Sequence, residues 1–333
     1  MKLTVLGAGC WGLTLAWLLT DNFDEVTVWG RECDISEDLR LNKHTTRPLE
    51  VQLKDKVEVT SDLASAISGA DIVMSVVATS GTRDVCENLK KAGIKPEQIF
   101  VNASKGIELP SLMRMSEVIK DVLPEQKLVI LSGPTLAKEV LAGKPTAACA
   151  ASEDMVAAEF VQKTCSVPGK FRLYTNSDVI GVELGGSLKN VIAIASGFAH
   201  EMGLGDNCAG TLLTRGMAEI VRVSLHLGAN PSTLYGLSGM GDLIATCSSP
   251  LSRNYTVGSM LGKGKKIDDI LRELGSVAEG VKTSKAICEL AKKLDIEVPV
   301  SNAIYEAVYT DITPDELLAK LMNRKLKEEE RYI

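Results

Sequence analysis

The chain has 333 residues, which is enough for two domains with sizeable cores. Hydrophobic residues make up 45% and charged residues 24%, a composition that excludes a disordered or fibrous protein. The formal net charge of −6 argues against nonspecific nucleic-acid binding, although a local cluster of lysine and arginine still allows an anionic substrate.

The first half of the chain alternates short β-branched runs with helical stretches. The expected strands are Lys2–Leu6, Val26–Trp29, Val57–Thr60, Asp71–Val77, Gln98–Ala103 and Lys127–Leu131. The expected helices are Cys10–Thr20, Ile35–Asn42, Asp62–Ser68, Thr82–Ala92, Leu112–Val122, Thr135–Leu141 and Glu153–Cys165. Apolar strands separated by helices predict a parallel sheet covered on both faces, and Thr146–Ala151 and Phe171–Tyr174 are expected to extend it.

The second half contains no convincing strand. Its expected helices are Gly181–Glu201, Cys208–Leu227, Pro231–Leu237, Ser252–Lys263, Ile267–Leu274, Ser284–Leu294, Ser301–Tyr309 and Thr313–Asn323. We therefore predict an α/β fold class in two parts. A Rossmann-type, mostly parallel sheet domain over residues 1–178 binds a dinucleotide, and an all-helical C-terminal domain over residues 179–333 binds substrate and carries the catalytic groups.

Cysteine and histidine spacing gives no sign of a metal site or a disulfide framework. The eight cysteines form no CxxC pair and the three histidines lie far apart. The uncharged run Leu3–Thr20 is interrupted by Gly7, Gly9 and Gly12, so a strand, a glycine turn and a buried helix explain it better than a signal peptide or membrane span. We expect free thiols, no membrane insertion and a cytoplasmic location.

The run Gly7-Ala8-Gly9-Cys10-Trp11-Gly12 matches the GxGxxG pattern. The pattern alone is weak, but here it follows a predicted strand and opens a helix, which is the context of a dinucleotide site. Gly7 would make the turn, Gly9 would let a pyrophosphate approach the backbone, and Gly12 would let the helix pack on the strand. A plain strand–turn–helix is the alternative.

The second predicted strand ends at Trp29-Gly30-Arg31. NAD-selective sites usually place a carboxylate there to hold the ribose 2′-hydroxyl, whereas an arginine can accept a 2′-phosphate. Arg31 therefore favours use of NADP(H) at least as well as NAD(H), although Glu32 follows directly. A purely surface role for Arg31 is the alternative.

Lys189 is a single cation in the apolar helical run Gly185–Gly197. No acidic residue lies on its helix face, and the glycines one turn earlier are expected to leave room for a ligand. We predict a buried amine with a lowered pKa that transfers a proton. The alternative is a lysine that extends its charge to water.

Polar residues with ligand-binding chemistry occur at four further places. Lys105 and the Gly133–Thr135 turn each follow a predicted strand, at the sheet edge where open α/β folds bind ligands. Asp242 is a lone acid in an apolar, glycine-rich stretch, so it needs a cation as Lys189 needs an anion. Ser252-Arg253-Asn254 offers the donors that a phosphate requires. The plainer alternatives are a surface lysine, a capping serine and a solvated arginine.

Together these motifs resemble one family. GAGCWG, ASKG, SGPT, GGSLKNVIAIASG, TRGMAEI, SGMGDL, SRN and VAEG occur in the order seen in bacterial-type NAD(P)-dependent sn-glycerol-3-phosphate dehydrogenases, over nearly the whole chain. The resemblance implies reversible reduction of dihydroxyacetone phosphate to glycerol 3-phosphate with NADP(H) and/or NAD(H) and no metal, supplying glycerophospholipid synthesis. It also implies a homodimer built on the helical domain.

The resemblance assigns roles to individual residues. Lys189 would be the proton-transfer group and Asp242 its catalytic partner. The implied substrate contacts are Lys105, Gly133, Thr135, Lys189, Asp242, Ser252, Arg253 and Asn254. The implied cofactor contacts, beside Gly7, Gly9 and Gly12, are Cys10, Trp11, Arg31, Lys105, Ala137, Arg253, Val277 and Glu279.

The chain departs from the family pattern in two places. Cys10 stands where serine is usual, and the usual tyrosine-leucine-proline stretch is missing around His44–Lys56. Two rival functions also remain open from the sequence. One is a 3-hydroxyacid or 6-phosphogluconate type of dehydrogenase, whose site must bind a carboxylate. The other is a non-catalytic NADP(H)-binding sensor, which would have no need for Lys189, Asp242 and Arg253 together.

Overall fold

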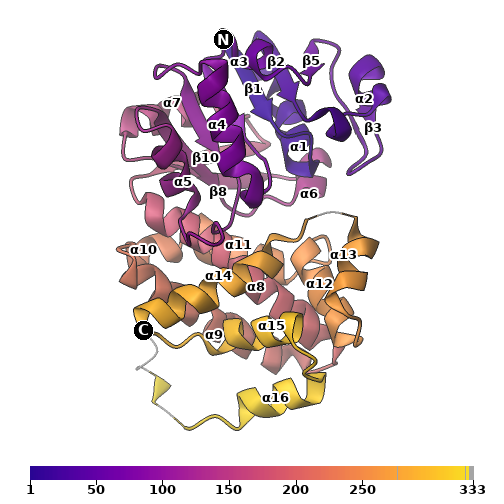
Figure 1. The fold of residues 1–333 in the computed structure, drawn as a ribbon, viewed down its shortest axis with the longest axis vertical. Helices are drawn as coiled ribbons and strands as arrows, with labels where there is room; N and C mark the ends of the chain where they lie inside the picture. The colour runs from indigo at the N-terminus through magenta and orange to yellow at the C-terminus, as the bar shows by residue number, and fades with distance from the viewer. Residues whose placement is uncertain (276, 327, 330–333) are drawn as a thin grey trace. The chain divides into compact units, whose positions relative to one another are not determined.

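The structure of the protein is a computed structural model that describes residues 1–275, 277–326 and 328–329 (Figure 1). It divides into two compact units. The first comprises Met1–Ser104 and Met115–Val179, and the second comprises Lys105–Arg114 and Ile180–Ile333. The division at Val179 lies next to the predicted boundary, whereas Lys105–Arg114, predicted in the first domain, groups with the second unit. Residues 276, 327 and 330–333 of the predicted second domain lie outside the described residues.

An eight-stranded sheet forms the first unit, in the order β10-β9-β8-β7-β6-β1-β2-β5. Its strands are β1 (Lys2–Leu6), β2 (Glu25–Trp29), β5 (Val57–Thr60), β6 (Ile72–Ser75), β7 (Ile99–Asn102), β8 (Lys127–Ser132), β9 (Thr146–Ala151) and β10 (Phe171–Asn176). All neighbours pair in parallel except β8 and β9, which are antiparallel. The mostly parallel sheet and its extension by the last two strands are therefore confirmed. A two-stranded pairing of β3 (His44–Thr45) with β4 (Val51–Gln52) was not predicted.

Helices follow the strands of the first unit and cover them. They are α1 (Cys10–Leu19), α2 (Glu37–Asn42), α3 (Leu63–Ile67), α4 (Thr82–Ala92), α5 (Met115–Val122), α6 (Ala137–Leu141) and α7 (Met155–Cys165). Local chemistry fixes their ends: the Asp62 and Asp154 carboxylates cap α3 and α7, and Gly93 ends α4 in the left-handed conformation. The predicted strand–helix alternation is present throughout this unit.

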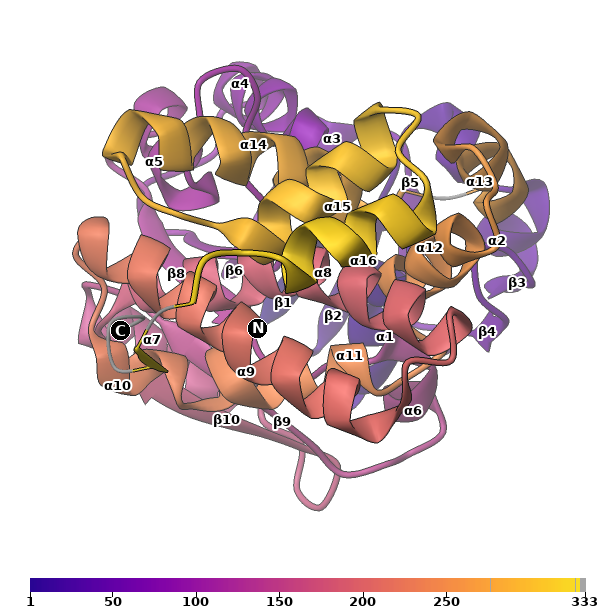
Figure 2. The ribbon, with the colours of Figure 1, turned by 90° about the horizontal axis from the view of Figure 1, so that it is seen from below.

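The second unit contains helices and one short π-helical turn, Leu237–Gly241. The helices are α8 (Val179–Glu201), α9 (Gly205–His226), α10 (Pro231–Leu234), α11 (Asp242–Cys247), α12 (Arg253–Gly262), α13 (Ile267–Leu274), α14 (Glu279–Leu294), α15 (Pro299–Tyr309) and α16 (Pro314–Met322). The π-helical turn and α11 were not predicted, and α14 begins at Glu279 rather than Ser284. Figure 2 shows α14, α15 and α16 packed in succession.

Helix α8 is the core of the second unit and is buried along nearly its whole length. Among the described residues it is the helix that is long and apolar enough to cross a membrane, but 89% of the relevant window is buried inside the protein. Its burial identifies it as a core helix. One polar group beside this core belongs to α9, where the buried Glu219 accepts from the Ser301 backbone N–H at 3.1 Å and hydroxyl at 2.9 Å at the start of α15.

Glycines bring α8 into direct contact with its neighbours. A Cβ at Gly197 would lie 1.9 Å from the Tyr255 carbonyl oxygen of α12. At Gly185 a Cβ would lie 2.7 Å from the Ser238 carbonyl oxygen, so the backbone of the π-helical turn fills the space there. The expectation that Gly185 leaves room for a ligand is therefore wrong, because this glycine serves helix packing.

Candidate active site

The glycine turn of the first unit connects the end of β1 to α1. Gly7 has φ +119°, and a Cβ at Gly12 would lie 2.0 Å from the Gly7 carbonyl oxygen, so the turn requires both glycines. At Gly9 a Cβ would meet no atom within 4 Å, and no side chain caps the start of α1. An open approach to uncapped N–H groups fits the pyrophosphate of a dinucleotide.

Cys10 and Trp11 form the first turn of α1, next to that approach. The Cys10 thiol contacts the Pro48 carbonyl oxygen at 3.5 Å, and the Trp11 ring packs edge-on against Phe171. Gly133, Thr135 and Ala137 follow β8, whose carboxyl end lies at the same edge of the parallel sheet. The Thr135 hydroxyl donates to the Gly133 carbonyl oxygen at 3.2 Å.

Arg31 is exposed just beyond the end of β2, and a carboxylate already engages it. Its Nε and Nη2 donate to the two oxygens of Asp34 at 2.6 and 2.9 Å. Glu32, the residue that complicates the cofactor prediction, is instead paired with Arg40 at 2.8 Å. A nucleotide 2′-phosphate would therefore compete with Asp34 for the Arg31 guanidinium.

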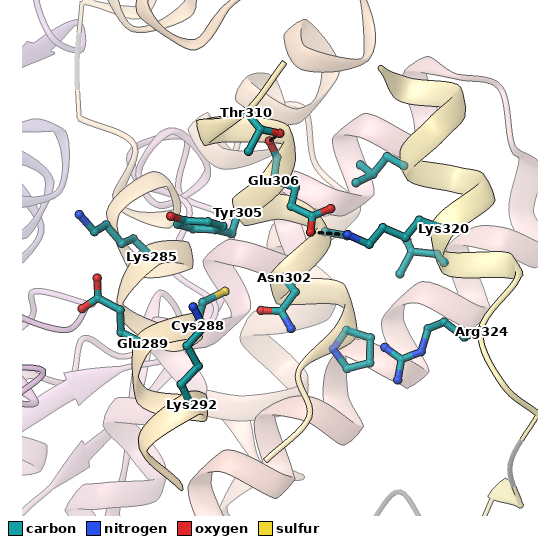
Figure 3. A pocket seen from close by; sticks show the side chains of 14 residues that line it. Lys285, Cys288, Glu289, Lys292, Asn302, Tyr305, Glu306, Thr310, Lys320 and Arg324 are labelled. Carbon is teal, nitrogen blue, oxygen red and sulfur yellow. Dashed lines mark hydrogen bonds and ion pairs between the residues drawn. The ribbon is translucent and has the colours of Figure 1, made fainter. Parts of the chain in front are cut away.

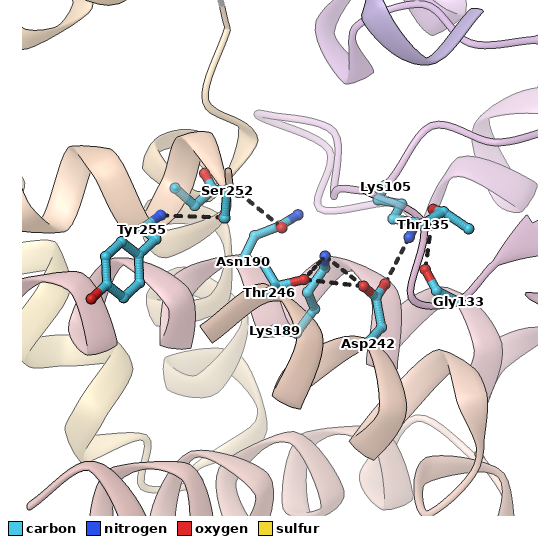
Figure 4. Close-up of polar contacts among 10 residues, drawn as sticks. Lys105, Gly133, Thr135, Lys189, Asn190, Asp242, Thr246, Ser252 and Tyr255 are labelled. Carbon is cyan, nitrogen blue, oxygen red and sulfur yellow. Dashed lines mark hydrogen bonds and ion pairs between the residues drawn. The ribbon is translucent and has the colours of Figure 1, made fainter. Parts of the chain in front are cut away.

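A buried charge cluster in the second unit joins Lys105, Lys189 and Asp242 (Figure 4). Lys189 Nζ donates to Asp242 Oδ1 at 2.8 Å, and Lys105 Nζ donates to Asp242 Oδ2 at 2.7 Å. Lys189 is only 7% exposed and Asp242 only 1%. The expectation that Asp242 supplies the anion for Lys189 is confirmed, and the possibility that Lys189 extends its charge to water is wrong.

Thr246 is a member of this cluster that the sequence analysis missed. Its hydroxyl accepts from Lys189 Nζ at 2.5 Å and donates to Asp242 Oδ1 at 3.1 Å. One turn of α11 separates Thr246 from Asp242, so a predicted helix at Asp242–Cys247 would have placed both on one face. An ammonium group has three hydrogens. Lys189 donates two of them to Asp242 and Thr246 among the described residues, which leaves one for a ligand.

The electrostatics of the cluster depend on two cations sharing one anion. Burial lowers the pKa of Lys105 to about 8; the Asp242 carboxylate opposes this shift and the Lys189 charge adds to it. Burial also disfavours ionisation of Asp242, but the charges of Lys105 and Lys189 outweigh it and hold the pKa of this carboxyl below its ordinary value. The site is therefore an anion held between two ammonium groups, with net positive charge.

Ser252, Arg253 and Asn254 lie at the start of α12. The Ser252 hydroxyl caps the helix by accepting from the Tyr255 N–H at 3.3 Å, as the plainer alternative proposed. The buried Asn254 amide donates to Asn190 Oδ1 at 2.9 Å and accepts from the Gly280 N–H at 3.0 Å. Asn190 was not predicted as a site residue, although it follows Lys189 directly within the GGSLKNVIAIASG motif.

Arg253 and Val277, which lies two residues before α14, face solvent. Arg253 is exposed at the start of α12. Val277 is also exposed, and Glu279 is the first residue of α14. Arg253 and Val277 are therefore available to ligands, in contrast to the amide of Asn254.

A cavity of about 560 Å³ lies elsewhere in the second unit, against α14, α15 and α16 (Figure 3). Cys288, Tyr305 and Lys320 are among the residues that line it, and none of the predicted site residues does. Over residues 1–275, 277–326 and 328–329, no group of three or more histidine, cysteine or acidic side chains is arranged to hold a metal ion.

A doubly wound sheet with an open glycine turn at one strand end, and a separate helical unit that buries a lysine–aspartate pair, define an oxidoreductase that uses a dinucleotide. Family models for the N-terminus and C-terminus of NAD-dependent glycerol-3-phosphate dehydrogenase match residues 2–158 and 178–319. The chain belongs to this family, as the motifs predicted.

Individual relatives agree with the family models. The chain is 44% identical over 330 residues to a glycerol-3-phosphate dehydrogenase [NAD(P)+] of Listeria monocytogenes, covering 98% of this chain and 97% of the relative. It is 42% identical over 327 residues to the enzyme of the same name from Bacillus subtilis, covering 97% and 94%. The crystal structure of glycerol-3-phosphate dehydrogenase from Coxiella burnetii superimposes with a TM-score of 0.91 at 30% identity, covering 97% and 99%.

Proposed function

We propose that the chain catalyses the reversible, NAD(P)H-dependent reduction of dihydroxyacetone phosphate to sn-glycerol 3-phosphate, with Lys189 as the proton-transfer group. The cluster of Lys189, Asp242 and Thr246 is the observation that carries this assignment. It holds a buried ammonium group in one geometry and leaves one of its hydrogens free for a substrate oxygen. Family membership favours this reaction over the hydroxyacid dehydrogenase and the non-catalytic sensor.

The chemistry requires a proton donor at the ketone oxygen. When bound, the reduced nicotinamide supplies a hydride to the carbonyl carbon. The oxygen then carries the developing negative charge, and the Lys189 ammonium neutralises it by donating a proton. In the reverse direction the neutral Lys189 amine takes the proton from the secondary hydroxyl. General acid–base help of this kind contributes about 10²–10⁴-fold in rate.

The other residues of the cluster position Lys189 and attract the substrate. The Asp242 carboxylate and the Thr246 hydroxyl each accept a hydrogen bond from the Lys189 amine, so two contacts hold it in place. Lys105 brings a second positive charge to the same carboxylate, which makes the cluster attractive to an anionic substrate. We assign Lys105 to substrate binding, with Asp242 as the catalytic partner of Lys189.

Phosphate binding is assigned to the start of α12. The exposed Arg253 guanidinium offers a fork of donors, and the N–H groups of the first helical turn lie beside it. Because the Ser252 hydroxyl and both polar atoms of the Asn254 amide already have partners, we expect these two residues to contribute less than Arg253. Gly133 and Thr135 remain assigned to substrate.

Cofactor binding is assigned to the first unit, with four contributions from the second. The pyrophosphate would lie at the open Gly7–Gly12 turn, where Cys10 and Trp11 provide backbone N–H groups. Arg31 would hold a 2′-phosphate when NADP(H) binds. We keep Ala137, and Lys105, Arg253, Val277 and Glu279 of the second unit, as cofactor contacts on the family pattern. The product supplies glycerophospholipid synthesis.

The proposal extends to location and assembly. All eight cysteines are free thiols, which suits a reducing cytoplasm. The homodimer rests on the family resemblance, and sedimentation analysis of the purified protein tests it.

Oxidation of NADPH and NADH with dihydroxyacetone phosphate as the acceptor tests the activity. We expect turnover with this substrate and none with a 3-keto acid or a keto form of phosphogluconate. Lys189→Met should abolish most turnover, whereas Lys91→Met, which removes an exposed lysine from α4, should not. Absence of turnover in the wild type, or full turnover in Lys189→Met, would refute the assignment.

A further inference from the structure

The segment Lys105–Arg114 is a small closed loop within the second unit. Ile107 and Arg114 pair as an antiparallel bridge, and the Glu108 N–H donates to the Met113 carbonyl oxygen at 2.9 Å. Ile107 is buried in the core of the helical unit. The loop therefore begins at the lysine that meets Asp242 and closes on itself at Arg114.

Helix α8 holds both ends of this loop. Arg114 Nη1 donates to Glu183 Oε2 at 2.7 Å, and the two side chains are only 15% and 5% exposed. At the lysine end, the Ser187 hydroxyl donates to the Gly106 carbonyl oxygen at 3.4 Å. Glu183 and Ser187 lie one turn apart on α8 and within two turns of Lys189. The helix that carries Lys189 thus also carries the attachments of the Lys105 loop.

We propose that Arg114 and Glu183 are positioning residues for Lys105: their buried ion pair fixes the loop on α8 so that the Lys105 amine reaches Asp242. The consequence for catalysis rests on the proposed function, because it assigns Lys105 to substrate binding. A flexible lysine on a loose loop would sample many positions, whereas a lysine on a loop anchored at both ends keeps its amine beside Asp242.

A purely stabilising role for the ion pair is the competing explanation. Buried ion pairs often add little stability over apolar side chains of similar volume, whereas their fixed, hydrogen-bonded geometry specifies one arrangement. The two roles separate when both charges are removed together. The double variant Arg114→Met/Glu183→Met removes both charges of this pair together, so it is expected to fold with nearly wild-type stability.

Two measurements then report on Lys105. The first is steady-state reduction of dihydroxyacetone phosphate. The second is the pH dependence of Lys105 acetylation by acetic anhydride in the ligand-free protein, followed by mass spectrometry. Burial lowers the pKa of Lys105 to about 8, and the charged groups that face its amine are Asp242 of α11 and Lys189 of α8. Release of the loop should expose the amine and raise its pKa toward the ordinary value of about 10.4.

For the double variant we expect an unfolding midpoint near that of the wild type, a higher midpoint of Lys105 titration and a kcat/KM reduced by about 10²-fold. Arg114→Lys keeps the positive charge but loses the planar set of guanidinium donors, so an intermediate loss of kcat/KM is expected. Arg272→Met removes an exposed ion pair with Asp269 on α13 and should change neither measurement. Wild-type titration and kcat/KM within threefold in the folded double variant would overturn the proposal.

Two further outcomes are decisive. If the double variant does not fold, the Arg114→Lys variant provides the test. A Lys105 titration and a kcat/KM that are unchanged in Arg114→Lys would also overturn the proposal. If the wild type reduces no dihydroxyacetone phosphate but the Lys105 titration shifts in the variants, the positioning role stands and the proposed function fails.

Discussion

Replacing Asp242 with asparagine tests whether one carboxylate holds both buried ammonium groups. Asparagine has nearly the same size and keeps one carbonyl oxygen, but it removes the charge. In the wild type the two oxygens of this carboxylate lie 2.7 Å from Lys105 Nζ and 2.8 Å from Lys189 Nζ, at a site that is 1% exposed. The variant therefore leaves two buried cations without an anion.

The loss of the Asp242 charge affects the free energy of the two lysines differently. With an effective dielectric constant near 20, each pair at this separation attracts by about 6 kcal/mol. Lys105 can release its proton instead, and because its pKa is about 8, this costs only about 1.4 kcal/mol at pH 7. Loss of the Lys105 charge then removes the repulsion between the two amines. Removal of one partner from a buried pair typically destabilises a protein by about 3–5 kcal/mol, and we expect a loss of unfolding free energy in that range.

The assay must separate the two units, because proteins with more than one domain commonly unfold in more than one step. Trp11, Trp17 and Trp29, the only tryptophans, lie in the first unit, so their fluorescence reports on it. Far-ultraviolet circular dichroism is dominated by helices, and it weights the second unit more heavily because the long helices α8, α9 and α14 lie there. In a urea titration at pH 7 we expect the dichroism transition to move to lower urea more than the fluorescence transition.

The pH dependence gives the sharpest test. Wild-type Lys105 keeps its proton up to about pH 8, whereas the variant has already lost it at pH 7. The variant therefore binds fewer protons than the wild type in this window, and the difference in stability should shrink by about 1.4 kcal/mol between pH 7 and pH 9. Asp269→Asn, an exposed aspartate on α13, is the matched control and should cost less than about 0.5 kcal/mol. A loss below 1 kcal/mol, or one that is constant with pH, contradicts the charge cluster.

Three further changes have expected outcomes. Lys189→Met should lower kcat by about 10²–10⁴-fold, while Arg253→Ala should chiefly raise KM, because it removes binding that ground and transition states share; steady-state kinetics separate the two. Asp34→Asn frees the Arg31 guanidinium, so the ratio of kcat/KM for NADPH over NADH should rise by about tenfold, and an unchanged ratio would argue against a 2′-phosphate contact. Burial raises the pKa of Glu219 to about 7, although hydrogen bonds from the N–H groups at the start of α15 oppose this shift. The folded carboxyl thus keeps its proton to a higher pH than the unfolded chain, and stability should fall by up to about 3 kcal/mol from pH 4.5 to 7, a slope that Glu219→Gln should remove.

Much of the first unit could be predicted from the sequence because its signals are local. Apolar β-branched runs define the strands, and the eight expected strands are all present. The GxGxxG turn is also local, since Gly7 needs a positive φ and Gly12 needs the absence of a Cβ within a few residues of each other. The antiparallel β8–β9 pair was not predictable, because strand direction depends on the path of the chain between the strands.

The second unit shows where local reasoning stops. Glycine-rich stretches carry a low helix propensity, and the π-helical turn with α11 was missed for that reason. The glycine at position 185 was assigned to ligand space, but it packs against the backbone near Ser238, far along the chain. A glycine in a sequence can indicate that a ligand or another part of the backbone approaches closely. Only the folded chain shows which of the two is present.

By itself the sequence determined that Lys189 is a lone cation in an apolar helix, and that it needs an anion if it is buried there. The tertiary structure alone decided which groups meet there. It brings Lys105 to the same carboxylate from 137 residues away, adds the Thr246 hydroxyl, and gives the Asn254 amide to Asn190 and Gly280. Burial follows from the composition of one segment, whereas shared partners follow from contacts between distant segments that no local pattern encodes.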